Sequence, residues 1–162
     1  MWGRAKKSAL ETGARAPAFQ LRNLAGDTVS LGDILAKGPA LLAFYKINCP
    51  VCQLTFPFLE RLAAGSGVQV IGISQDDFSA TTAFNQRFGI TFPTLLDSAK
   101  ESYPASNAFG ITNVPTLFLV EPDGEIANTI SGFSKRDLEA VGARAGVKPF
   151  RADENVPEWK AG

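Results

Sequence analysis

The 162-residue chain contains no histidine. This absence excludes an imidazole general base, and with it every Ser-His or Cys-His catalytic pair. It also argues against a structural zinc site, because such a site needs four Cys or His ligands and the only cysteines are Cys49 and Cys52. We therefore expect no bound metal, and the chemistry open to the two thiols requires no bound cofactor.

Net charge and long apolar segments are lacking as well. Lys plus Arg and Asp plus Glu number 16 each, so no overall field attracts nucleic acid or an anionic membrane. No segment reaches the ~20 apolar residues of a membrane helix, and the basic N-terminus has no apolar stretch typical of a signal peptide. The sequence thus predicts a protein without nucleic-acid or membrane partners, in the cytoplasm, or in the periplasm if a leader has been removed.

The chain has enough apolar residues for one buried core. Its hydrophobic content is 45%, and segments with strand and helix patterns alternate, which predicts an α/β fold. The expected strands are residues 19–21, 28–30, 39–45, 68–73, 92–96, 115–120 and 125–130, of which the first two form an N-terminal β-hairpin around Gly26. The expected helices begin at Cys49, Asp76 or Asp77, Pro104 and Ser134, and the expected core includes Phe56, Phe84, Phe88 and Phe118.

Three segments differ in composition and periodicity. We expect one domain over residues 14–146, an N-terminal extension over residues 1–13 and a C-terminal tail over residues 147–162. The tail is polar and lacks periodicity, which indicates a segment that is either loosely ordered or packed on the surface.

The two cysteines stand together as Cys49-Pro50-Val51-Cys52, between the apolar run of residues 39–45 and a segment with helical periodicity. A cysteine at the start of a helix lies beside unpaired backbone N–H groups, which together with the helix dipole stabilise a thiolate. Cys52 lies on the same helical face, close enough for a disulfide. The pattern favours a redox-active dithiol with Cys49 as the nucleophile, although two buried, inert thiols would also fit it.

Several motifs give the chain a resemblance to a known family. They are Ala16-Pro17-Ala18-Phe19, Ile73-Ser74-Gln75-Asp76-Asp77, Phe92-Pro93-Thr94-Leu95-Leu96-Asp97, Val114-Pro115-Thr116 and Glu121-Pro122-Asp123-Gly124. With the dithiol they resemble the redoxin branch of the thioredoxin superfamily over residues 14–146, a branch that holds TlpA/ResA-like thiol-disulfide oxidoreductases and AhpC/TSA proteins. The resemblance implies a thioredoxin-like fold with a central mixed sheet flanked by helices.

The resemblance also implies that Pro115 is a cis-proline facing the dithiol. A cis Val114-Pro115 bond would expose the backbone of Val114 to an extended substrate chain. Without the resemblance, a trans proline opening an edge strand would be the better interpretation, since cis bonds are only about 5–6% of X-Pro bonds. The expected substrate-binding residues are therefore Pro50, Val114 and Pro115.

The positions before Cys49 distinguish two activities within the branch. In its peroxidases, a proline seven residues and a threonine or serine three residues before the reactive cysteine bind peroxide, and Leu42 and Lys46 occupy these positions here. Thiol-disulfide exchange, in which Cys52 resolves a mixed disulfide, is therefore favoured over a peroxiredoxin-like thiol peroxidase. A module that holds a soft metal such as Cu(I), or that is catalytically idle, is an alternative of another class.

The resemblance identifies proton acceptors that this chain lacks. Thioredoxins carry a buried acid six residues before the first cysteine, and the membrane-tethered reductases a glutamate three residues after the second. Ala43 and Thr55 occupy these positions. Lys46 is a candidate cation near the thiolate, although a lysine at a strand end is more often simply solvated. The expected partners are a protein or small-molecule disulfide and an external dithiol reductant or oxidant, and we expect a monomer or weak dimer.

Overall fold

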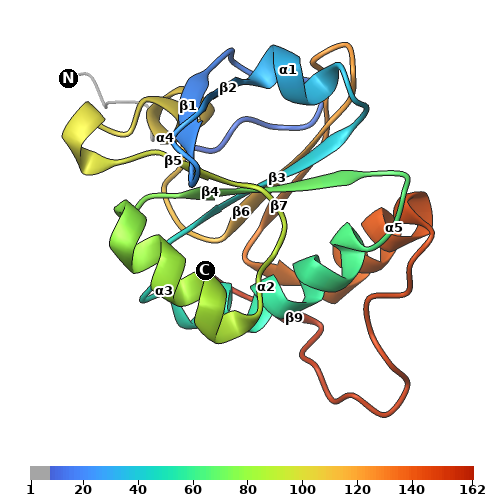
Figure 1. Cartoon of the computed structure of the whole chain (residues 1–162). Coiled ribbons are helices and arrows are strands. Elements are labelled where there is room, and N and C mark those ends of the chain that lie inside the picture. The colour runs from blue at the N-terminus through green and yellow to red at the C-terminus, as the bar shows by residue number, and fades with distance from the viewer. Residues whose placement is uncertain (1–7) are drawn as a thin grey trace, which may run out of the picture.

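The structure is a computed structural model that describes residues 8–162 (Figure 1). In these residues, seven strands form one mixed sheet in the order β2-β1-β5-β4-β3-β6-β7. β3 lies at its centre, parallel to β4 and antiparallel to β6, and β1 pairs with β2 as the expected N-terminal hairpin. The expected α/β class and mixed sheet are confirmed. The strands are β1 (Gln20–Asn23), β2 (Thr28–Ser30), β3 (Ala40–Tyr45), β4 (Gln69–Ser74), β5 (Thr94–Leu96), β6 (Thr116–Val120) and β7 (Ile126–Ser131).

Four of the five α-helices within the described residues begin where the sequence indicates. Their N-caps or first residues are Cys49, Asp77, Pro104 and Ser134, and glycines with positive φ end the last three. Helix α2 runs without interruption through Pro57, which has no backbone N–H to donate within the helix. The helices are α1 (Leu31–Leu35), α2 (Pro50–Ala63), α3 (Phe78–Phe88), α4 (Pro104–Phe109) and α5 (Lys135–Ala145), with the 3-10 turn η1 (Ala99–Glu101) before α4.

Helix α1 is the one that the sequence patterns did not indicate. Ser30 caps it, because the Ser30 hydroxyl accepts from the Asp33 N–H at 3.0 Å and the Asp33 carboxylate accepts from the Ser30 N–H at 3.2 Å. This reciprocal capping box was the available signal. A five-residue helix is too short to display apolar periodicity of its own.

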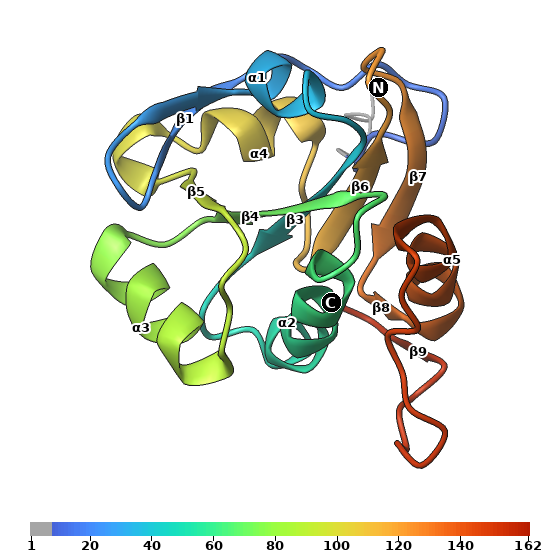
Figure 2. The same ribbon diagram turned by 45° about the vertical axis from the view of Figure 1, so that its right-hand side comes forward.

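The sheet separates two apolar cores. Helices α2, α3 and α5 cover one face, and α1 and α4 cover the other (Figures 1 and 2). Successive β3 side chains serve both faces, because Leu41 and Tyr45 lie in the first core while Leu42 and Phe44 lie in the second. Every β3 residue is buried, which explains its unbroken apolar run.

The phenylalanines expected in the core are placed there with one exception. Phe56, Phe84 and Phe118 are buried. Phe88 is half-buried instead and packs its ring on Phe84, with centroids 4.6 Å apart, at the end of α3. A position in the last turn of a surface helix leaves one side of this ring in solvent.

Residues before the first strand also pack on the domain. The Leu10 N–H donates to the Phe109 carbonyl at 3.1 Å, and the Thr129 hydroxyl donates to the Leu10 carbonyl at 2.6 Å. The part of the expected extension that lies in residues 8–13 is therefore held by hydrogen bonds, and residues 1–7 lie outside the described part of the chain.

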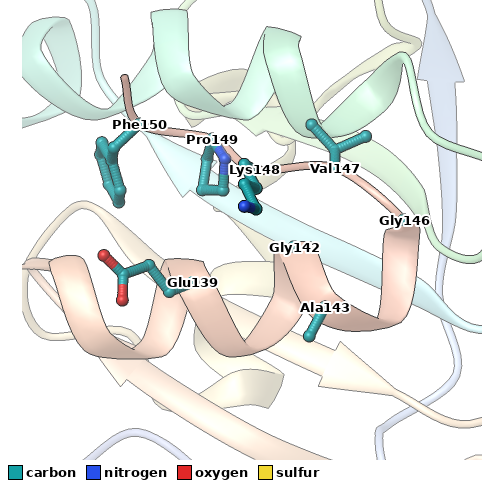
Figure 3. A pocket seen from close by; sticks show the side chains of 8 residues that line it. All are labelled: Glu139, Gly142, Ala143, Gly146, Val147, Lys148, Pro149 and Phe150. Atoms are coloured by element: carbon teal, nitrogen blue, oxygen red, sulfur yellow. The ribbon is translucent and has the colours of Figure 1, made fainter. Parts of the chain in front are cut away.

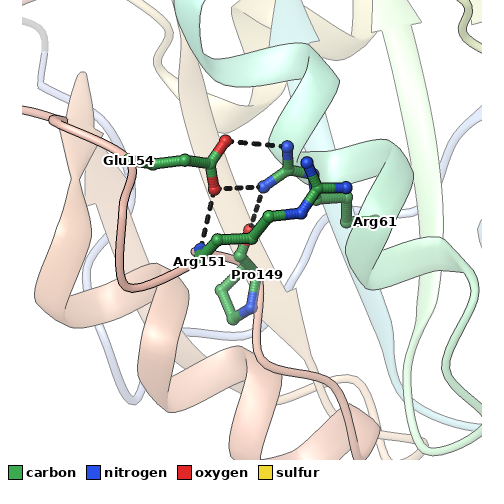
Figure 4. Close-up of polar contacts among 4 residues, drawn as sticks. All are labelled: Arg61, Pro149, Arg151 and Glu154. Atoms are coloured by element: carbon green, nitrogen blue, oxygen red, sulfur yellow. Dashed lines mark hydrogen bonds and ion pairs between the residues drawn. The ribbon is translucent and has the colours of Figure 1, made fainter.

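The C-terminal tail packs on the surface, which was one of the two expectations for it. After α5 the tail passes α2, where the two terminal nitrogens of the Arg61 guanidinium donate to the carboxylate of Glu154, at 2.6 and 2.8 Å (Figure 4). Arg61 also donates to the Pro149 carbonyl at 2.8 Å. It then forms β9 (Trp159–Lys160), which pairs antiparallel with β8 (Phe133–Ser134). The sequence lacked a signal for this strand because only two residues pair.

The Arg61–Glu154 pair makes the docking of the tail sensitive to acid. The hydrogen bond from Arg61 lowers the pKa of Glu154 from 4.5 to about 2. Because the pKa of Glu154 is lower in the folded than in the unfolded state, its ionised carboxylate stabilises the fold at pH values above 4.5. This stabilisation is lost as the pH falls toward about 2. We expect wild type to melt above Glu154→Gln at neutral pH and this difference in melting temperature to vanish near pH 2. A difference that persists unchanged at acid pH would contradict the assignment.

Candidate active site

Cys49 lies where the chain leaves the buried strand β3 and enters α2. It is the N-cap of α2, with an extended backbone, and its side chain is half-buried. Its Sγ accepts a hydrogen bond from the Cys52 N–H at 3.1 Å and donates one to the Val114 carbonyl at 3.3 Å. The thiol is therefore placed between a helix N-terminus, which favours negative charge, and the backbone of the Val114-Pro115 segment.

Cys52 is the buried partner in the first turn of α2. Burial raises the pKa of its thiol, the hydrogen bond with Cys49 and the negative charges of Cys49 and Asp76 raise it further, and a hydrogen bond with the Lys46 backbone lowers it. Both cysteines are free thiols. The pKa of Cys52 is therefore raised by its burial, whereas Cys49 is half-exposed, so the two thiols differ in their access to solvent.

Asp76 is a site residue that sequence reasoning missed. Its carboxylate accepts the Ile47 N–H at 2.8 Å, while the Ile47 carbonyl accepts from the Gln53 side chain at 3.0 Å. The sequence suggested Asp76 or Asp77 as the cap of α3, and Asp77 takes that role by accepting the Ala80 N–H at 2.8 Å. Asp76 instead holds the loop that precedes Cys49, a contact between residues too distant in sequence to be seen as a pattern.

The substrate-binding residues expected from the sequence lie around Cys49. The Val114-Pro115 bond is cis, as expected, and the Val114 carbonyl faces the Cys49 thiol. Pro50 is the first residue of α2 and is exposed. The Lys46 side chain is also exposed, and its backbone carbonyl accepts the Cys49 N–H at 3.4 Å.

The two positions that hold proton acceptors in related proteins are inert here. Ala43 is fully buried in β3 and has no ionisable group. Thr55 is fully buried too, and its hydroxyl donates back to the Val51 carbonyl within α2 at 2.7 Å. Besides Cys49, the carboxylate of Asp76 is a group whose negative charge raises the pKa of Cys52.

Replacing Asp76 by asparagine should make Cys52 more acidic. Asparagine keeps an oxygen for the Ile47 N–H but removes the negative charge that raises the pKa of Cys52. In a Cys49→Ser background we expect Cys52 to be alkylated faster than with Asp76 present, because a lower pKa leaves more of the thiol as thiolate. Asp77→Asn is the matched control, since asparagine caps a helix as well as aspartate does. Equal rates in both variants would show that the charge of Asp76 does not reach the thiol.

A cavity of about 520 Å³ lies away from the dithiol. It is enclosed by the end of α5 and the segment that follows, including Gly142, Val147, Pro149 and Phe150 (Figure 3). Neither cysteine lines it. The candidate site is thus a surface position at the start of α2.

Residues 8–162 contain neither a group of metal-ligating side chains nor a membrane-spanning helix. Within this part of the chain, no three His, Cys, Asp or Glu side chains are grouped so that they could hold a metal ion. Over the same residues, no helix has the length and apolar character needed to cross a membrane.

The sheet order, the dithiol at the start of α2 and the cis-proline opposite define a thioredoxin-fold dithiol protein. The sequence pattern of the AhpC/TSA family matches residues 12–129. The chain therefore belongs to the AhpC/TSA family, and thiol-disulfide oxidoreductase is the function class that its relatives carry.

Two relatives and two solved structures illustrate this. The thiol-disulfide oxidoreductase ResA of Geobacillus kaustophilus is 30% identical over 139 residues, which are 83% of this chain and 78% of the relative. ResA of Bacillus subtilis is 26% identical over 132 residues, 79% of this chain and 72% of the relative. A thiol:disulfide interchange protein DsbE from Chlorobium tepidum superposes with a TM-score of 0.72 at 26% identity, covering 84% of this chain and 96% of that one. Peroxidoxin BcpB from Mycobacterium tuberculosis, at 24% identity and a TM-score of 0.68 over 84% and 94% of the two chains, shares the fold.

Proposed function

We propose that Cys49 is the nucleophile and Cys52 the resolving thiol of a disulfide reduction. The Cys49 thiolate attacks one sulfur of a substrate disulfide, the substrate S–S bond breaks, and the other substrate sulfur leaves as a thiolate that takes up a proton. Cys49 is then joined to the substrate by a mixed disulfide. The hydrogen bond from the Cys52 N–H and the N-terminus of α2 stabilise Cys49 before the attack.

Cys52 completes the exchange. Its thiol loses a proton and attacks the Cys49 sulfur, the mixed disulfide breaks, and the second substrate thiolate leaves and is protonated. Two electrons have then passed from the protein to the substrate, and a Cys49–Cys52 disulfide remains. An external dithiol reductant must return it to the thiol form. Run in reverse, the same steps oxidise a substrate dithiol at the expense of the protein disulfide.

The observation that carries this proposal is the position of the Cys49 Sγ, between the Cys52 N–H and the Val114 carbonyl. A substrate chain that pairs with the backbone of Val114 would have its disulfide within reach of the thiolate. Substrate contacts are therefore assigned to Pro50, Val114 and Pro115, with protein or small-molecule disulfides as substrates. The exposure of the Lys46 side chain leaves its effect on the thiolate a prediction.

We propose the cytoplasm as the place of this activity, with the periplasm as the alternative; in the cytoplasm a disulfide of this pair would be transient and catalytic. Detection of the protein in the periplasmic fraction of its own cells would move the proposal to that compartment and change the reductant to one found there.

Parallel assays of disulfide and peroxide reduction test the proposal. With dithiothreitol as electron donor, we expect wild type to accelerate the reduction of insulin disulfides and to consume hydrogen peroxide slowly, because Leu42 and Lys46 offer no peroxide-binding proline or threonine. Faster consumption of peroxide than of disulfide would instead identify a peroxidase. If the protein is active in neither assay but binds Cu(I) tightly, it is a metal-holding module. If it is active in neither assay and Cys49 has ordinary thiol reactivity, it is a catalytically idle module.

A further inference from the structure

The segment Glu158–Gly162 lies beside the candidate active site. β9 runs antiparallel to β8, with Lys160 opposite Phe133, and the Glu158 carbonyl accepts the Lys135 N–H at 3.0 Å. Both views of the ribbon place the chain end next to α2, the helix that begins at the dithiol (Figures 1 and 2). The segment thus extends the small β8–β9 sheet toward Cys49.

Its contact with the substrate-binding backbone is close. A Cβ atom placed on Gly162 would overlap the Val114 carbonyl group and lie 2.9 Å from the Asn113 side-chain nitrogen. On the other side, a Cβ on Gly132 would overlap the Lys160 carbonyl oxygen. The backbones of the segment, of Gly132 and of Val114 therefore meet with no room for side chains between them.

The Val114 carbonyl that Gly162 contacts is the one that accepts the Cys49 thiol. An extended polypeptide that paired with Val114 would have to take the place of this segment. Resting on the function proposed above, we propose that Glu158–Gly162 is a specificity-determining segment, which competes with polypeptide disulfides for the backbone of Val114. A small disulfide needs only the Cys49 sulfur and does not meet this competition.

The contacts of the segment make it displaceable. Only two residues pair between β8 and β9, and the indole of Trp159, 61% exposed, makes a hydrogen bond to the Ser131 carbonyl at 3.3 Å. The Arg61–Glu154 pair lies upstream and holds the tail on the domain. A displaced segment therefore stays at a high effective concentration and returns when the substrate leaves.

Kinetics with two classes of substrate test the proposal. Gly162→Val should push the segment off Val114, and a chain ended after Val156 should lack it. We expect both variants to lower KM for insulin by roughly three- to tenfold, because the segment no longer competes with a polypeptide for Val114. For oxidised glutathione, which does not need this backbone, kcat/KM should change by less than about twofold. Ala152→Val enlarges a side chain at an exposed tail position outside Glu158–Gly162 and should behave as wild type. A synthetic peptide of residues 156–162 should restore the higher KM to the shortened chain.

The fluorescence of Trp159 provides a readout that does not depend on activity. Trp2→Phe leaves Trp159 as the single tryptophan, and Cys52→Ser allows a stable mixed disulfide to be made chemically between Cys49 and an activated cysteine-containing hexapeptide. We expect the emission of Trp159 to shift to the red when the peptide is attached, because the indole leaves Ser131, and not when 2-mercaptoethanol is attached.

The outcomes separate this proposal from the function on which it rests. If wild type reduces insulin and glutathione but Gly162→Val leaves KM for insulin unchanged, the segment does not compete and the inference is overturned. An unshifted Trp159 emission with the hexapeptide attached overturns it as well. If wild type reduces neither substrate, the proposed function fails, and the fluorescence result alone then decides whether the segment leaves Val114 for a peptide.

Discussion

The Cys52→Ser variant should accumulate a covalent complex with its disulfide substrate, whereas Cys49→Ser should form none. Cys49 is half-exposed at the N-terminus of α2, so it can attack a substrate, while Cys52 is fully buried and burial raises the pKa of its thiol. Without Cys52 the first step proceeds and the second cannot. Without Cys49, no thiolate is placed to begin the reaction.

Each variant is incubated with disulfide-bonded insulin, and non-reducing electrophoresis and intact mass measurement then check this prediction. We expect a species of the summed mass for Cys52→Ser that dithiothreitol removes, and catalytic disulfide reduction at the background rate for both variants. The Cys49→Ser, Cys52→Ser double variant is the control for non-specific association. Efficient trapping by Cys49→Ser would reverse the assigned roles.

The Phe56→Ala variant should lose about 3–5 kcal/mol in its free energy of unfolding, the range for a buried phenylalanine truncated to alanine. The Phe56 side chain is fully buried one turn after Cys52. Its ring lies 4.1 Å from Tyr45, and 5.8 Å from both Phe84 and Phe92, measured between centroids. These partners come from β3, α3 and the segment before β5, so the cavity would weaken the packing of α2 on the sheet.

Urea unfolding followed by circular dichroism measures this loss. Phe78→Ala is the matched control, because the Phe78 side chain is 54% exposed at the start of α3 and its truncation should change stability by no more than about 0.5 kcal/mol. Phe56→Leu should fall between the two, since leucine fills part of the space. A loss below about 1 kcal/mol for Phe56→Ala would show that the core closes around the missing ring.

Local signals in the sequence account for most elements of the fold. The apolar run that became β3, the Ser134 cap of α5 and the glycines that end α3, α4 and α5 each depend on neighbouring residues only. The short helix α1 and the two-residue strand β9 were not predicted from the sequence, because neither is long enough to show a periodic apolar pattern. The capping box of α1 is local, whereas the position of β9 depends on its pairing with the distant strand β8.

Some residues of the candidate site could also be identified from the sequence, and others could not. Cys49, Cys52 and the missing acceptors at Ala43 and Thr55 could be identified from spacing and from the family resemblance. Asp76 could not, because its contact with Ile47 joins two strand ends that are brought together only by the parallel pairing of β3 and β4.

The sequence by itself determined which reactive groups are available, namely two thiols at helical spacing and no histidine to assist them, whereas the proline facing them was expected only from the family resemblance. Side-chain types and short spacings are local properties, so they can be seen before the chain folds. Only the tertiary structure decided what surrounds the thiols, namely the burial of Cys52, the charge of Asp76 and the placement of Gly162 against Val114. These depend on segments far apart in sequence, whose meeting is set by the packing of the whole sheet and its helices.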